Sequence, residues 1–174
     1  PMRETLGFAP DDKVFVFVSA GHYRRKGFFL AVEALALFRK SQCTAKLLVV
    51  GGTESRLRAL QEQLDAQHPG WREFVTFTGM VPDVERYFAA SDAFLFPSFS
   101  EAFALVEVEA AACGLPLFLT RHHGSEMILE DGVNGRYVDF DAKRIAEVLA
   151  EFIENKWRPQ PGVHLKHALD SEAY

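Results

Sequence analysis

The chain has 174 residues, of which 48% are hydrophobic and 25% are charged, and its net charge is −5. This length suits one domain, and sixteen phenylalanines imply a substantial core rather than disorder. The acidic balance gives no support for a protein that binds nucleic acid or an anionic membrane surface. No apolar run reaches the ~18 residues of a membrane span. With two widely separated cysteines and no C-x-x-C pair, we expect a cytoplasmic protein. Because the sequence starts at Pro1 and not at methionine, we expect a piece of a longer chain.

Short apolar runs rich in β-branched and aromatic residues predict five strands. Helical spacing of apolar residues predicts the helices between them, with Asp83 capping a further short one. Strands that are apolar throughout and alternate with helices indicate a parallel sheet covered on both faces. We therefore predict a Rossmann-like, doubly wound α/β domain over residues 1–157, followed by a linker and a helical tail over 158–174. The expected strands are 14–19, 45–50, 75–78, 93–96 and 117–119, and the main helices are 28–40, 54–67, 103–113 and 141–154.

A basic triplet lies on the loop expected after the first strand, and it consists of Arg24, Arg25 and Lys26. In an open parallel sheet, ligands bind in the crevice beyond the carboxyl ends of the strands. A triplet of this kind is usually a solvated patch, but this position favours a functional role. A cation there could neutralise a diphosphate leaving group as its charge develops. On the same loop, His22 directly follows Gly21 and is the best histidine candidate for a ligand contact.

Three glutamates stand out because they are the only charged residues in 93–120. Glu101 precedes a predicted helix and could accept hydrogen bonds from a sugar, or it could merely favour the positive helix end. Glu107 and Glu109 lie inside that helix, ~200° apart, so they point to opposite sides. We assign Glu107 to solvent and Glu109 to the crevice, although the pattern alone allows the reverse. Glu109 could also simply pair with an arginine.

The start of the same helix offers backbone donors to an anion, because the first N–H groups of a helix have no partner within it. The groups concerned belong to Phe103, Ala104, Leu105 and Val106. Neither a G-x-x-x-x-G-K-[ST] nor a G-x-G-x-x-G pattern is present in the sequence. A P-loop NTPase and a dinucleotide dehydrogenase therefore find no support.

The cysteines and the remaining histidines predict no metal site. Cys43 and Cys113 are far apart and form no C-x-x-C pair, so we expect buried, reduced thiols. His164 and His167 are spaced to share a metal but have no third ligand nearby. His122 and His123 lie on a loop that faces the same crevice and could contact a ligand, but we expect them at the surface, with Ser125 capping the helix that follows.

Four stretches of the sequence together carry a family resemblance. The main one is PSFSEAFALVEVEAAACGLPL, which is similar to the pattern P-S-x-x-E-G-F-G-L-V-x-L-E-A-x-A-x-G-x-P-V. The others are RRKGFFLAVEAL, FTGMVPDVERYFAASDAFLFPS and RHHGSEMILEDGVNGRYV. On these motifs the chain resembles, over residues 2–154, the carboxy-terminal, donor-binding half of retaining glycosyltransferases of family 4. The resemblance implies one half of a GT-B fold.

The resemblance also implies roles for individual residues. Glu101 would bind the hydroxyls of the donor sugar, and Glu109 would bind the ribose diol. Arg25 and Lys26 would hold the diphosphate, which makes Glu101, Lys26 and Arg25 the catalytic set, while Glu107 would face water. No metal and no cofactor are expected. The other donor-binding residues would be Gly21 and His22, Met80 and Val81 near the nucleobase, and Phe103, Ala104, Leu105 and Val106 through their backbone.

By the same resemblance, the enzyme would transfer a sugar from a UDP- or GDP-sugar to an acceptor hydroxyl with retention of configuration. The acceptor would belong to lipopolysaccharide or polysaccharide biosynthesis, and the full-length enzyme could contact the inner face of the membrane. Its partners would be the nucleotide sugar and an amino-terminal acceptor domain that this sequence lacks, so the fragment alone should be inactive. Three residues depart from the family pattern: Ala102 and Ala104 replace glycines, and His22 replaces an arginine.

Two other readings stay open on the sequence. A nucleotide-sugar 2-epimerase shares the architecture but does not use this glutamate pair in the same way. A non-catalytic nucleotide-binding or protein-interaction module would keep the fold without the chemistry, and the two alanines in place of glycines add weight to that reading.

Overall fold

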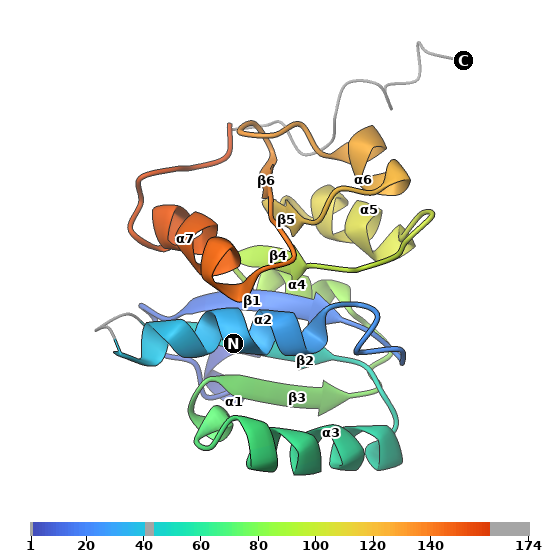
Figure 1. Ribbon diagram of the computed structural model, residues 1–174, viewed down its shortest axis with the longest axis vertical. Coiled ribbons are helices and arrows are strands. Elements are labelled where there is room, and N and C mark those ends of the chain that lie inside the picture. The colour runs from blue at the N-terminus through green and yellow to red at the C-terminus, as the bar shows by residue number, and fades with distance from the viewer. Residues whose placement is uncertain (1, 41–43, 161–174) are drawn as a thin grey trace.

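The computed structural model describes residues 2–40 and 44–160, and these form a six-stranded parallel sheet with helices around it (Figure 1). The strand order is β3-β2-β1-β4-β5-β6. The order reverses at β1, so the loops after β1 and β4 flank the crevice where ligands bind in such sheets. The strands are β1 Lys13–Val18, β2 Ala45–Val50, β3 Val75–Gly79, β4 Ala93–Phe96, β5 Leu117–Leu119 and β6 Gly135–Tyr137.

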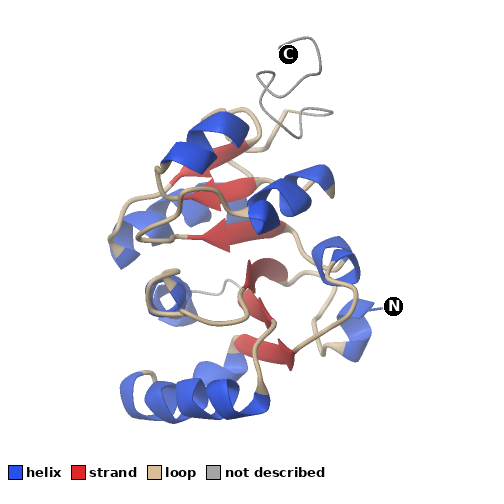
Figure 2. Cartoon of the chain, turned by 90° about the vertical axis from the view of Figure 1, so that its right-hand side faces the viewer, coloured by secondary structure: helices blue, strands red, loops and turns tan. Residues whose placement is uncertain are grey.

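Helices cover both faces of this sheet, as Figure 2 shows. In Figure 1, α2, α3 and α7 lie in front of the strands, and α2 packs against α7. None of the helices in the described ranges is long and apolar enough to cross a membrane. The helices are α1 Met2–Thr5, α2 Phe28–Ala36, α3 Glu54–Gln67, α4 Glu85–Ala89, α5 Leu105–Ala112, α6 His123–Ile128 and α7 Ala142–Ile153, with 3₁₀ turns at Leu37–Lys40 and Trp71–Glu73.

The core is centred on β1, whose residues from Val14 to Phe17 are all fully buried. A strand covered on both faces reads as a continuous apolar run, which explains the VFVF sequence. The ring of Phe15 packs edge-on against Phe118 of β5 and Phe152 of α7, each with its centroid 6.0 Å away. These contacts join β1 and β5 to one covering helix.

Most predicted elements are confirmed, and the differences are local. A sixth strand, β6, escaped prediction because its sequence, Gly-Arg-Tyr, is not an apolar run, unlike the equally short β5. The helix predicted from residue 103 begins at Leu105, because Ala104 is extended, with φ −108° and ψ 105°. Asp83 does not cap α4, whose N-cap is Val84. Of the predicted linker and tail, residues 158–160 form no helix or strand, and 161–174 lie outside the described residues.

Candidate functional site

Two crevice loops are bonded to each other at the centre of the carboxyl edge. The backbone N–H of Phe99 donates to the carbonyl oxygen of Arg25 over 2.8 Å, and the Ser98 hydroxyl donates to the same oxygen over 3.4 Å. Gly27 lies between the loops with φ 79°, and a Cβ there would fall against the carbonyl oxygen of Pro97. Only glycine permits both this conformation and this approach. The basic triplet and the loop after β4 are therefore one structural unit.

This unit places cations beside Glu101. The single hydroxyl hydrogen of Ser98 can instead go to Glu101 Oε1, 3.2 Å from the hydroxyl oxygen, so Ser98 is placed to orient the half-buried carboxylate. The Lys26 ammonium lies 5.5 Å from the centre of the Phe96 ring, at the end of β4. Arg25 is exposed, and within the described part of the chain no side chain bonds its guanidinium. The structure brings these three charged residues to one edge of the sheet, and their roles in a site stay predictions.

The first turn of α5 opens onto the same edge. Ala104 is its N-cap and makes no side-chain capping bond, so the N–H groups at this end are not occupied by a cap. Among the described non-glycine residues, only His22 and Asn155 have a positive φ. Ala102 and Ala104 therefore sit in backbone conformations that do not require the glycines of the family pattern.

The loop after β5 packs against the loop after β4 and is hydrogen-bonded to it. The hydroxyl of Thr120 donates to the carbonyl oxygen of Ser98 over 2.5 Å. Gly124 lies so close that a Cβ there would be 2.9 Å from both the Ala102 carbonyl oxygen and the Phe103 Cα. The position of the Glu101 loop thus depends on two neighbouring loops, not on its own residues alone.

Glu107 does not face solvent, and that expectation is wrong. Its side chain is 0% exposed, and Oε1 lies 2.9 Å from His122 Nε2. The second oxygen, Oε2, has no hydrogen-bond partner in the described structure. Burial raises the pKa of Glu107 above its ordinary value, and the bond from His122 opposes that rise. Glu109, on the other side of α5, is exposed, as a residue that binds a ligand from the crevice must be.

His122 is also not a surface residue, because only 8% of its side chain is exposed. It is the N-cap of α6, the role expected for Ser125: its Nδ1 accepts from the Ser125 N–H over 3.1 Å. In return, the Ser125 hydroxyl oxygen accepts from the His122 N–H over 2.9 Å. A ring nitrogen that accepts carries no proton, so Nε2 holds the proton and donates to Glu107.

Cys113 was expected to be buried and is exposed, because it follows the last turn of α5.

Sequence reasoning missed the Glu107–His122 pair, although one signal was present. Ala110 and Ala111 follow Glu107 by three and four residues, and both are fully buried. Positions at these spacings share one face of a helix. Small apolar residues at both positions therefore indicated that Glu107 belongs to the covered face and Glu109 to the open one.

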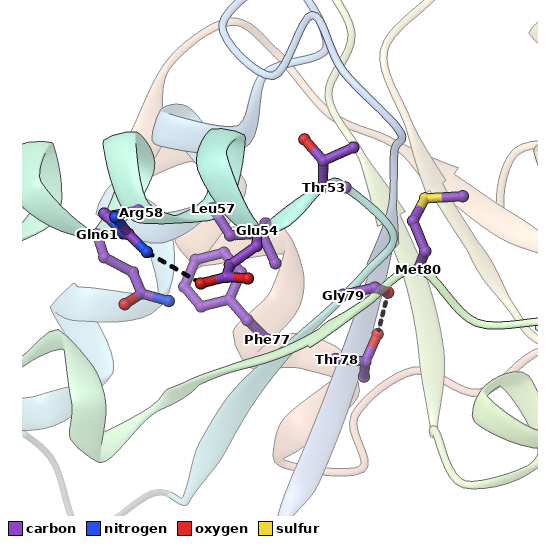
Figure 3. Close-up of a pocket in the computed structure, with 10 residues that line it drawn as sticks. Thr53, Glu54, Leu57, Arg58, Gln61, Phe77, Thr78, Gly79 and Met80 are labelled. Carbon is purple, nitrogen blue, oxygen red and sulfur yellow. Dashed lines mark hydrogen bonds and ion pairs between the residues drawn. The ribbon is translucent and has the colours of Figure 1, made fainter.

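An open pocket of ≈ 540 Å³ lies between the start of α3 and the end of β3 (Figure 3). Met80, 64% exposed, lines it, whereas Val81 packs partly against the core. Figure 3 shows the Glu54 carboxylate, which accepts from Arg58 over 2.9 Å. The lining residues are Gly52, Thr53, Glu54, Leu57, Arg58, Gln61, Phe77, Thr78, Gly79 and Met80.

A second pocket, of ≈ 600 Å³, lies beside the basic triplet and includes His22. His22 is exposed and has φ 55°, a conformation rare for residues other than glycine. The preceding Gly21 lies against Arg56 of α3, whose Nη1 donates to the Ala20 carbonyl oxygen over 2.5 Å. Gly21 thus lets the loop pack closely against Arg56, and His22 is exposed at the crevice. Over the described ranges, no group of three or more His, Cys, Asp or Glu side chains could hold a metal ion.

The strand order arranges these features in a row along the carboxyl edge. The first pocket belongs to β2 and β3, the cations follow β1, and Glu101 follows β4. Adjacent strands lie ~4.8 Å apart, so β3 to β4 is a distance of about 14 Å. An elongated ligand with an anionic middle and a hydroxyl-bearing end fits this row.

Comparison with known proteins identifies the family of the chain. Residues 12–155 match the family model described as Glycosyl transferases group 1. Sucrose synthase 2 of Pisum sativum is 31% identical over 169 residues, covering 87% of this chain and 21% of the relative. D-inositol 3-phosphate glycosyltransferase of Paenarthrobacter aurescens is 33% identical over 141 residues, covering 79% of this chain and 34% of the relative. This chain thus spans about a third or less of the length of these two relatives.

A solved structure extends the likeness to the fold. Anabaena Alr3699/HepE in complex with UDP-glucose superposes with a TM-score of 0.76 and 27% identity, covering 89% of this chain and 42% of that one. The six-stranded parallel sheet corresponds to one Rossmann-like half of a GT-B glycosyltransferase. Because the family model matches most of its length, the chain belongs to the glycosyl transferases group 1 family.

Proposed function

We propose that this chain is the donor-binding domain of a retaining glycosyltransferase that uses a UDP-sugar. The observation that carries the proposal is the bond from the Phe99 N–H to the Arg25 carbonyl oxygen, which fixes the basic triplet against the Glu101 loop. A diphosphate needs cations and a sugar needs hydrogen-bond acceptors. Here both lie on loops that are bonded together.

Each part of the donor has a place in this proposal. Arg25, Lys26 and the open N–H groups of α5 hold the diphosphate, and a helix N-terminus favours an anion. Glu101 accepts from the hydroxyls of the donor sugar, and the exposed Glu109 accepts from the ribose diol. The base lies toward the pocket that Met80 lines, two strands away from the cations.

In the reaction we propose, the bond between the anomeric carbon and the diphosphate oxygen breaks, and its electron pair leaves with the diphosphate. The acceptor hydroxyl oxygen bonds to the anomeric carbon on the same face, and its proton passes to the leaving oxygen. Lys26 and Arg25 stabilise the charge that develops on the diphosphate, and fixed charges aimed at a developing charge are usually what lowers such a barrier most. The two cations take the place of a divalent metal, so we expect a chelator to leave donor binding unchanged.

UDP is the nucleotide we favour, because Alr3699/HepE binds UDP-glucose and shares the fold at 27% identity. The rest of the proposal concerns a longer protein. An amino-terminal domain would supply the acceptor site, with an envelope polysaccharide or lipopolysaccharide as acceptor. The enzyme would work in the cytoplasm, at the inner face of the membrane.

A thermal-shift screen of the full-length protein tests this proposal with UDP, GDP, ADP and their sugar conjugates. A ligand at a hundred times its dissociation constant stabilises the folded state by ~2.7 kcal/mol. For a domain of this size that unfolds on its own, that corresponds to an increase in melting temperature of roughly 5–11 °C, and a longer chain that unfolds as one unit would shift less. We expect this shift with UDP and UDP-sugars and its loss in Lys26→Ala and Glu109→Ala. Stabilisation that persists in both variants would contradict the site. No shift with any nucleotide would contradict nucleotide binding and would favour a non-catalytic protein-interaction module.

A further inference from the structure

Glu107 is a buried carboxyl group for which the proposed chemistry has no use. It lies in the first turn of α5, where the diphosphate would bind, and its side chain is 0% exposed. One oxygen accepts from His122 Nε2 over 2.9 Å, and Oε2 has no partner in the described structure. A buried carboxylate with an unpartnered oxygen is costly, whereas the protonated form is cheaper to bury. Oε2 is therefore the position where a proton would be held.

The histidine cannot take this proton without structural damage. His122 Nδ1 accepts from the Ser125 N–H over 3.1 Å and caps α6. A protonated ring would present an N–H at Nδ1, lose this bond and place two donors face to face. Nε2 already carries the ring's proton and donates it to Glu107 Oε1. Of the two side chains, only Glu107 can bind a proton with the capping arrangement intact.

Three titratable groups act on Glu107 from the elements around it. They are His122 at the start of α6, Lys26 on the loop after β1 and Glu101 on the loop after β4. The charge of Lys26 favours the ionised form of Glu107, and the charge of Glu101 disfavours it. A diphosphate bound at Lys26 offsets that positive charge and adds negative charge nearby. Both effects favour the protonated form of Glu107.

We propose that Glu107 is the residue that couples diphosphate binding to proton uptake, with the proton held on Oε2 when the site is occupied. The inference rests on the proposed donor site, and it concerns the regulation of that site. Its consequence is an affinity for the donor that falls as the pH rises, by at most about tenfold per pH unit for one linked proton. Glu107 acts on the ligand through charge and does not touch it.

The test is isothermal titration calorimetry of UDP-glucose with the full-length protein across the neutral pH range. UDP-glucose is the right probe because its diphosphate is a diester, whereas a terminal phosphate titrates near a pKa of about 6. Glu107→Gln keeps an oxygen that accepts from His122 but cannot ionise. The matched control is Glu147→Gln, which makes the same change at an exposed position of α7.

We expect the wild type and Glu147→Gln to bind UDP-glucose more weakly at higher pH, and Glu107→Gln to lose most of that dependence. Titrations in two buffers of different ionisation enthalpy should show proton uptake by the wild type and much less by Glu107→Gln. An unchanged pH slope in Glu107→Gln would overturn the inference and leave the proposed function standing. So would zero proton uptake by the wild type, a result that does not depend on how the variant folds. If the wild type binds no UDP-glucose at any pH, both proposals fail.

Discussion

The backbone N–H of Phe99 donates to the carbonyl oxygen of Arg25 over 2.8 Å, although the two residues are 74 positions apart in the sequence. A main-chain bond of this kind depends on no side chain at either residue. It makes the loop after β1 and the loop after β4 move together. The cations and the Glu101 carboxylate are thus presented to a ligand in a fixed relation, which reduces the entropy lost on binding.

The first prediction concerns the contact that keeps these loops together. Gly27→Ala should destabilise the domain by more than about 2 kcal/mol, because it combines a left-handed backbone with a clash against the Pro97 carbonyl. Gly132→Ala is the control, since Gly132 has φ 80° but nothing within 4 Å of a Cβ. It should lose only about 1–2 kcal/mol. Urea unfolding of both variants measures the difference, and equal losses would show that the close approach is unimportant.

Lys26 is predicted to contribute to ligand binding more than to folding. Lys26→Ala should weaken UDP-glucose binding at least about tenfold, which corresponds to ~1.4 kcal/mol, because a charge-assisted contact to the diphosphate is lost. Lys143→Ala removes the same charge at an exposed position of α7 and should bind as the wild type does. Equal affinities for the two variants in a calorimetric titration would exclude Lys26 from the diphosphate site.

Gly124 should affect the sugar end of the site selectively. In Gly124→Ala the new Cβ would meet the Ala102 carbonyl oxygen and the Phe103 Cα, so the Glu101 loop must move by a few tenths of an ångström. We expect UDP-glucose to lose more affinity than UDP, because only the former carries the sugar that Glu101 would bind. Parallel titrations with the two ligands give the ratio. A uniform loss for both would instead indicate damage to the diphosphate end.

The raised pKa of Glu107 predicts how stability depends on pH. The unfolded chain ionises Glu107 at a lower pH than the folded chain does, because burial raises the folded pKa. Its contribution is therefore fully present below the unfolded pKa and is lost as the pH rises through the folded pKa. Glu107→Gln should remove this loss, so its stability relative to the wild type should increase with pH. Thermal melts at several pH values check this, and a constant difference would contradict it.

The sequence predicts the fold well where buried runs are long. β1 and β2 are continuous apolar strands, and α3 has the bounds that the spacing of Leu57, Leu60 and Leu64 indicates. β6 was not predicted because Gly-Arg-Tyr lacks the apolar run that predicts the equally short β5, and its identity as a strand comes from pairing with β5. Local pattern cannot reveal an element that tertiary pairing creates.

For the site, the sequence predicts which loops meet but not how buried charges are satisfied. Arg25, Lys26 and Glu101 follow strands that are neighbours in the sheet, so strand order alone brings them together. The environment of Glu107 depends on His122, fifteen residues later, and on a capping geometry that only the folded chain shows. The buried Ala110 and Ala111 on the same helix face indicate that Glu107 is buried, but no pattern in the sequence indicates that His122 is its partner.

The most direct test of the proposed donor site is the affinity of the full-length protein for UDP-glucose and for UDP, measured by calorimetry in the wild type and in Glu101→Gln. We predict that the wild type binds both ligands. Glu101→Gln should lose affinity for UDP-glucose by about tenfold and retain its affinity for UDP, because only the sugar meets that carboxylate. Wild-type protein that binds neither ligand, or a variant that binds UDP-glucose as tightly as the wild type, would contradict the donor site described for this chain.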